Sequence, residues 1–366
     1  MLDFLLYYAT PFMGMLAAIF IATIVLEIRR SNKRFSTTTD TVLGREKEID
    51  QLARLILAGQ SSALIGIFDQ ERTAILNVLR NPQNFSKLYA SEANRLIFSY
   101  VDISTFTRES TPVDFWQRAL MPLESVESQQ IQSLCKTCAD NQYGNYYLEK
   151  LIEQLQQERL KLVLMVHKFD LLLQLDSFKI NFLALLRGLA ASHHPSALVS
   201  VITMNMTVTQ LMSSNKIIGL MGSNLLSYVM EMILAPLPDK QTKSLLTEGN
   251  YTDSASDLTG NFPYLISWFN EVLCEINPEI EQLAKEEARI KLKELFMQRL
   301  DRIIRDALDS HFFSTNGESL SLKALLSKLS TVPQEDQREL EKMGVVFKVG
   351  ETYQPNPLIF KDFIIS

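Results

Sequence analysis

The sequence predicts an α/β fold in which a parallel sheet is covered by helices on both faces. Short apolar runs of strand length recur along the chain, and helical patterns such as Tyr146–Glu158 and Phe178–Ala191 separate them. Continuously apolar strands that alternate with helices are typical of a parallel sheet buried on both faces. The runs are Ser62–Ile67, Leu96–Val101, Leu160–Val166, Leu198–Met204 and Met230–Leu234.

The composition is that of a folded protein of two or three domains without a basic excess. Of the 366 residues, 46% are hydrophobic, enough for a sizeable core. The 36 Lys and Arg against 42 Asp and Glu leave a net charge of −6, whereas nucleic-acid binders are normally basic. The pair Cys135 and Cys138 lacks the second pair that a structural zinc site needs. We therefore expect no metal and no nucleic-acid partner.

The first thirty residues predict a transmembrane anchor. Phe4–Leu26 contains no charged residue over 23 positions, and a helix of that length, about 34 Å, crosses a bilayer's hydrocarbon core. A cleaved signal peptide would carry basic residues ahead of a shorter run, and a buried soluble helix is the other alternative. Basic residues follow the run directly, at Arg29, Arg30, Lys33 and Arg34. The positive-inside rule then predicts a single-pass protein of the cell membrane, with its N-terminus outside and its bulk in the cytoplasm.

The loop after the first strand predicts a damaged phosphate site. A P-loop places G-x-x-x-x-G-K-[ST] between strand and helix, where backbone N–H groups and the Lys hold phosphate and the hydroxyl holds magnesium. Here the frame runs from Gly66 to Thr73, with Glu71 in place of the second Gly and Arg72 in place of the Lys. Asp69 and Glu71 are therefore expected where a triphosphate's charge would lie, and like charges repel strongly in a partly desolvated loop.

The third apolar run ends in a second altered motif. In a P-loop ATPase this strand delivers a magnesium-binding Asp and a water-activating Glu. Those positions hold His167 and Lys168, and only the later Asp170 remains. A His beside a Lys is a poor metal site, so we interpret His167 as a strand-end residue without chemistry.

With these motifs, the chain resembles the STAND and archaeal origin-recognition-like branch of AAA-related P-loop ATPases over about residues 41–365. Four further matches follow in the order of that family: Gly44-Arg45-Glu46 is similar to its "GRE" box, Ser200–Asn205 to its sensor strand, Leu234–Leu237 to the turn before its lid, and Leu258–Leu265 to its lid motif. The lid motif keeps Gly260 and Pro263 but replaces the second Gly and the His by Asn261 and Phe262. The resemblance implies a P-loop NTPase-like parallel sheet with a helical lid and a C-terminal winged helix.

The segment after the lid has the element order of a winged helix. Two short helices, Leu320–Leu329 and Glu335–Met343, precede a hairpin that begins at Val345. A DNA-reading winged helix should carry basic residues on its second helix. This helix instead has Glu335, Asp336, Glu339 and Glu341 against Arg338 and Lys342. A contact with protein is therefore favoured over a contact with DNA.

The expected domains are a transmembrane anchor (1–30), a linker (31–40), a P-loop NTPase-like core (41–237), a helical lid (238–310) and a winged helix (311–366). The core contains an irregular insertion at about 102–147, rich in Ser, Gln and Thr. This insertion and the acidic winged helix are the expected contact surfaces.

These observations predict a membrane-anchored, catalytically inactive STAND-like pseudo-ATPase that serves as a signalling or scaffold subunit. It needs no cofactor, and it works with a protein partner or as a homo-oligomer. One alternative is an active or nucleotide-binding ATPase in which Arg72, Thr73 and Asp170 suffice, with ATP and magnesium. The other is a membrane-bound transcription regulator that uses the winged helix.

Overall fold

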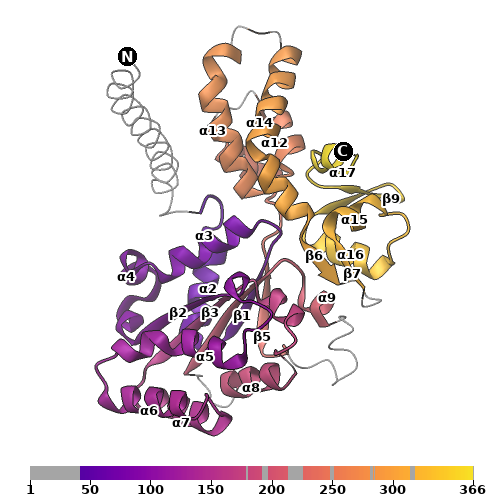
Figure 1. Ribbon diagram of the computed structural model, residues 1–366. Helices are drawn as coiled ribbons and strands as arrows, with labels where there is room; N and C mark the ends of the chain where they lie inside the picture. The colour runs from indigo at the N-terminus through magenta and orange to yellow at the C-terminus, as the bar shows by residue number, and fades with distance from the viewer. Residues whose placement is uncertain are drawn as a thin grey trace, which may run out of the picture. The chain divides into compact units, whose positions relative to one another are not determined.

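The computed structural model describes residues 42–178, 180–191, 197–212, 226–247, 251–280, 283, 285–313 and 318–365. The elements below all belong to one compact unit, Leu43–Ser366. Figure 1 shows its central sheet with helices on both faces.

A five-stranded parallel sheet forms the centre of this unit. Its strands are β1 Ser61–Ile65, β2 Leu96–Asp102, β3 Lys161–His167, β4 Leu198–Met204 and β5 Val229–Ile233, in the order β2-β3-β4-β1-β5. Every residue of β1 and β4 is buried, which is why their sequences are mostly apolar, with a few small hydroxyl residues, rather than alternating. The predicted α/β class with a parallel sheet is confirmed, and all five predicted runs are strands.

The strand order positions the candidate site. Parallel strands end at the same edge of a sheet, and ligands of such sheets bind in crevices at that edge. Because β4 lies between β1 and β3, the loop that leaves β1 after Ile65 lies beside the end of β4, where Ile65 pairs with Met204. The end of β3 follows one strand further along, at His167.

Helices and short 3₁₀ turns connect the strands. In the first half these are α2 Glu46–Ala58, α3 Asp69–Arg80, η1 Pro82–Asn84, α4 Phe85–Tyr89, η2 Ala90–Arg95, η3 Ile103–Thr105, α5 Pro112–Leu120, η4 Met121–Ser125, α6 Gln129–Asp140, α7 Asn145–Gln157, η5 Phe169–Gln174, α8 Ile180–Ala191 and α9 Val208–Met212. The irregular structure expected at about 102–147 is therefore wrong, because α5 and α6 fill much of that segment. Its hydroxyl residues cap helices instead of breaking them: Thr111 forms a capping box with Asp114, and Ser128 caps α6.

Among the residues that the structure describes, four helices follow β5, and a smaller mixed module comes after them. The helices are α11 Asp239–Leu245, α12 Thr252–Thr259, α13 Pro263–Ile280 and α14 Lys285–Leu308. The C-terminal module comprises β6 His311–Phe313, β7 Ser319–Ser321, α15 Leu322–Ser327, α16 Gln334–Lys342, β8 Val346–Val349, β9 Thr352–Pro355 and α17 Phe360–Ile365, with β6-β7 and β8-β9 as antiparallel pairs. The two short helices and the hairpin predicted from the sequence are present, while the domain boundaries stay a prediction.

The predicted localisation in the cell membrane requires correction. In the part of the chain that the structure describes, no helix combines the length and the apolar character that crossing a bilayer demands. The run Phe4–Leu26, on which the anchor and its orientation depended, lies outside the described residues. An apolar run indicates only that a segment avoids water, and a protein core excludes water as well as lipid does. The run alone was therefore insufficient evidence for a membrane location.

Candidate functional site

The loop after β1 is much shorter than a P-loop. β1 ends at Ile65 and α3 begins at Asp69, so only three residues connect them. The backbone N–H of Arg72 donates to the carbonyl of Phe68 at 3.3 Å, as in a regular helix. Two acidic residues in the first turn suit the positive end of the helix. Position 71 also lacks the glycine whose backbone freedom would favour a loop over a helix. The segment from Asp69 onward is therefore helical where a P-loop would wrap around phosphate.

The Asp69 carboxylate is the centre of a network of charged and polar side chains. Its Oδ1 lies 2.9 Å from Arg72 Nη2 and 3.0 Å from His167 Nε2, while its Oδ2 lies 2.9 Å from Lys168 Nζ. Arg72 also donates through Nη1 to the carbonyl of Gly66. Three of the predicted site residues, Arg72, His167 and Lys168, thus converge on one carboxylate, and Gly66 is joined to them through Arg72.

The environment of Asp69 favours its ionised form. Burial on its own would raise the pKa of Asp69, but the hydrogen bond from His167 and the positive charge of Arg72 outweigh it and hold that pKa well below its usual value. The side chain stays one-third exposed. The site therefore contains a permanent negative charge at neutral pH, at the place where the sequence predicted phosphate to be repelled.

Glu71 points elsewhere, contrary to the prediction that both carboxylates lie at the phosphate position. Its Oε1 accepts a hydrogen bond of 2.8 Å from Nε of Arg45, and both side chains are 1% exposed. Nη1 of Arg45 reaches Glu48 Oε1 at 3.0 Å. Burial raises the pKa of Glu71, opposed by the charge of Arg45. The residue in place of the second P-loop glycine thus ties α3 to the segment that resembles the "GRE" box.

His167 is not only the last residue of β3, because both of its ring nitrogens contact polar side chains. Its Nδ1 lies 2.9 Å from Thr203 Oγ1, which also accepts the backbone N–H of Lys168 at 3.1 Å. Its Nε2 lies 3.3 Å from Thr73 Oγ1 as well as near Asp69. An imidazole with its proton on Nε2 satisfies the contacts to Asp69 and Thr203 together. Thr203, at the end of β4, lies within the predicted sensor strand Ser200–Asn205, but the sequence analysis did not assign it to the site.

Thr73 is engaged by its own helix. Its hydroxyl donates to the backbone carbonyl of Asp69 at 3.0 Å, a bond that helical Thr residues commonly make. In a P-loop this hydroxyl binds magnesium. Among the described residues, no group of three or more His, Cys, Asp or Glu side chains is placed to hold a metal ion.

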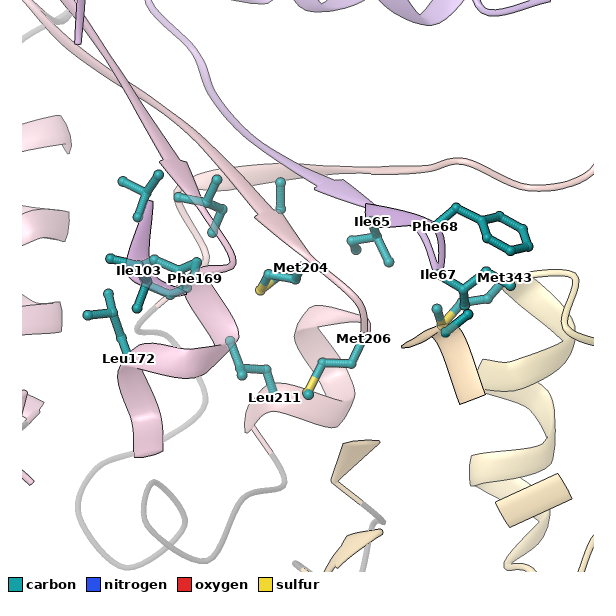
Figure 2. Close-up of a cluster of buried hydrophobic side chains, with 14 of the residues drawn as sticks. Ile65, Ile67, Phe68, Ile103, Phe169, Leu172, Met204, Met206, Leu211 and Met343 are labelled. Atoms are coloured by element: carbon teal, nitrogen blue, oxygen red, sulfur yellow. The ribbon is translucent and has the colours of Figure 1, made fainter. Parts of the chain in front are cut away.

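The lid motif meets the loop after β1 through aromatic rings. Phe68 packs edge-on against Phe262 with ring centroids 5.2 Å apart, and Tyr264 lies at 5.7 Å. Gly260, with φ +55°, ends α12, and Pro263 opens α13. Figure 2 shows Ile67 and Phe68 in a cluster of buried side chains that also contains Met343 of the C-terminal module. The lid motif thus contacts the loop through Phe262 and Tyr264, which flank Pro263 in the sequence, and not through the charged network.

Asp170 is buried beside this network. It lies in η5 at 5% exposure, and its Oδ1 has no hydrogen-bond partner among the described residues. Burial raises its pKa from 3.8 to about 6, against the opposing charge of Arg72. A carboxyl group that is buried in this way is poorly placed to hold a hydrated magnesium ion.

The raised pKa of Asp170 predicts a pH-dependent cost to stability. A folded-state pKa above the unfolded one means that the protonated carboxyl stabilises the fold fully below about pH 4 and that this contribution is lost as the pH rises through about 6. Asp170→Asn should therefore gain stability over the native chain between pH 4 and 7, by up to about 3 kcal/mol. Urea unfolding of both proteins across this range measures the gap; a gap that does not change with pH would contradict the assignment.

Comparisons with known proteins concern the fold. No family model matches the chain, and no curated protein matches it. The ORC2 protein of Aeropyrum pernix in its ADPNP-ADP complexes is 12% identical, with 88% of this chain and 94% of that chain covered and a TM-score of 0.46. A Walker-type ATPase of Pyrococcus abyssi is 15% identical, with 87% and 95% covered and a TM-score of 0.48. The ORC1 protein of Aeropyrum pernix in complex with DNA is 14% identical, with 89% and 94% covered and a TM-score of 0.41. Archaeal origin-recognition proteins, to which the sequence motifs pointed, are thus among the solved structures that this chain resembles.

Proposed function

We propose that this protein is a nucleotide-independent pseudo-ATPase, a STAND-like module that acts as a signalling or scaffold subunit through contacts with protein. The observation that supports this most strongly is the Asp69 network. A side chain of the protein already takes up the Arg72, His167 and Lys168 groups at the end of the sheet where a nucleotide's phosphates would need them. A nucleotide would have to displace this carboxylate and overcome its charge.

The positions needed for hydrolysis support the same proposal. An ATPase of this class uses an Asp to hold magnesium and a Glu to orient the attacking water. His167 and Lys168 stand at those positions, and both contact Asp69 instead. Asp170 is buried, and Thr73 donates to its own helix. The alternative in which Arg72, Thr73 and Asp170 support catalysis would require all of these contacts to rearrange.

A role in protein contact is favoured over DNA binding by the second helix of the C-terminal module. On α16, Asp336 and Glu339 are buried, and the exposed Glu335 and Glu341 balance the basic Arg338 and Lys342, so the helix presents no basic excess. A helix that enters the major groove approaches a surface of negative phosphates, which basic residues favour and acidic ones oppose. Without a nucleotide to drive it, a change of conformation must come from a partner that binds two states with different affinity.

Titration of the full-length chain with nucleotide tests the proposal. Calorimetric titration with micromolar ATP or GTP and magnesium should give no heat of binding. Incubation with either nucleotide should release no phosphate above the rate in buffer. Hydrogen exchange of the loop, α3 and the end of β3 should also be unchanged by ATP. A micromolar dissociation constant that Thr73→Ala abolishes would contradict the proposal and favour the ATPase alternative.

A further inference from the structure

The contacts of Asp69 have the form of an oxyanion-binding site. Three cationic or N–H donor groups converge on its two oxygens, at distances between 2.9 and 3.0 Å. They come from separate parts of the chain: Arg72 from α3, His167 from the end of β3, and Lys168 from the turn that follows. Charge-assisted donors around a two-oxygen anion, at the first turn of a helix, are the arrangement by which proteins bind phosphate and sulfate groups.

The donors around Asp69 are not all used. Arg72 is buried, with a side chain 4% exposed, yet its Nε has no hydrogen-bond partner among the described residues. Lys168 and Asp69 are each about one-third exposed, so the network opens to solvent on their side. A buried guanidinium with an unused N–H can donate to a further oxygen acceptor.

We propose that the Asp69 carboxylate is a built-in anion that takes the place of a phosphate group, so that the loop after β1 carries its own ligand. This inference rests on the proposed nucleotide-independent function and adds to it the group that keeps the site occupied. The same donors, freed of Asp69, form a site for inorganic oxyanions such as pyrophosphate.

The variant Asp69→Ala tests this inference in the full-length chain. It removes the negative charge and leaves Arg72 and Lys168 beside each other without a counter-ion. Pyrophosphate should then bind at least about tenfold more tightly than to the native chain, as expected from relief of one close charge repulsion. The midpoint of thermal unfolding of the variant should rise with pyrophosphate concentration at constant ionic strength, whereas that of the native chain should not.

Glu71→Gln is the matched control. Glu71 lies two residues further along the same helical turn and loses the same charge, but it contacts Arg45 rather than the Asp69 network. It should gain no pyrophosphate binding. Adding Arg72→Ala to Asp69→Ala should abolish the gained binding, which would assign it to this site.

Two outcomes would overturn the inference: a folded Asp69→Ala protein that binds no pyrophosphate, or equal binding by Glu71→Gln. If the alanine variant does not fold, Asp69→Asn removes the charge at nearly constant shape and is held to the same criteria. Failure here is distinct from failure of the proposed function, which depends on whether the native chain binds ATP.

Discussion

Replacing Glu71 with alanine is expected to destabilise the fold by about 3–5 kcal/mol, because it removes the buried counter-ion of Arg45 and leaves only the more exposed Glu48. The side chains of Arg45 and Glu71 are both 1% exposed, and their hydrogen bond is 2.8 Å long. Nη2 of Arg45 already lacks a partner among the described residues, so little remains to compensate for the loss. Urea unfolding of the variant and the native chain measures the difference.

Comparison with a double variant tests whether the cost comes from leaving one charge buried without its partner. Removing both charges, by Arg45→Leu with Glu71→Leu, should cost less than Glu71→Ala alone, because no charge is then left buried and unpaired. Glu48 is the control: it also contacts Arg45 but is 23% exposed, so Glu48→Ala should cost less than about 1 kcal/mol. If Glu71→Ala cost no more than Glu48→Ala, the pair would not have the structural role assigned to it.

The contact between Glu71 and Arg45 also determines the effect of restoring the P-loop glycine at position 71. The P-loop pattern suggests that glycine at position 71 would reopen the site. Glu71 does not face the site, however, and Glu71→Gly would remove the partner of Arg45 and add a flexible residue to the first turn of α3. The carboxylate that matters for an anion is Asp69.

The sheet could be predicted from the sequence because its signal is local. A strand buried on both faces is mostly apolar and does not alternate, so β4 was predicted from Leu198 to Met204, as the structure has it. The membrane localisation was wrong because hydropathy does not identify what covers an apolar run. The insertion was misjudged because Ser and Thr were read as helix breakers, although at Thr111 and Ser128 they are helix caps.

The sequence predicted which residues belong to the candidate site but not which way their side chains point. The motif treats residues 66–73 as a loop, which places Asp69 and Glu71 together. Once the helix begins at Asp69, residues two apart point to nearly opposite sides of it, and the two carboxylates separate. The absence of glycine at position 71 and the acidic first turn were signals of that early start. The motifs contain Arg45 and Thr203 but do not pair them with Glu71 and His167, because the partners are 26 and 36 residues apart in the sequence.

The junction between the core and the C-terminal module depends on Gly344. This residue follows α16 with φ +71°, and its carbonyl accepts a hydrogen bond of 2.8 Å from Asn356 Nδ2. Asn356 also donates to the carbonyl of Gly260 at 3.1 Å, which links the module to the lid motif. A Cβ at Gly344 would overlap Cδ and Cγ of Pro236, in the turn after β5. There is thus no space for a side chain between the module and this turn.

Gly344→Ala should carry two costs, the strain of a left-handed backbone and the overlap with Pro236. Its matched control, Gly350→Ala, carries only the first. Gly350 has a similar φ of +62°, but a Cβ there would meet nothing within 4 Å. Gly350→Ala should lose about 1–2 kcal/mol from the left-handed backbone alone, and Gly344→Ala a further 1–3 kcal/mol, roughly, from overlap with Pro236. Thermal and urea unfolding measure both, and limited proteolysis should cut Gly344→Ala faster near Pro236. Equal losses in the two variants would mean that Gly344 and Pro236 do not pack closely enough for the added methyl group to matter.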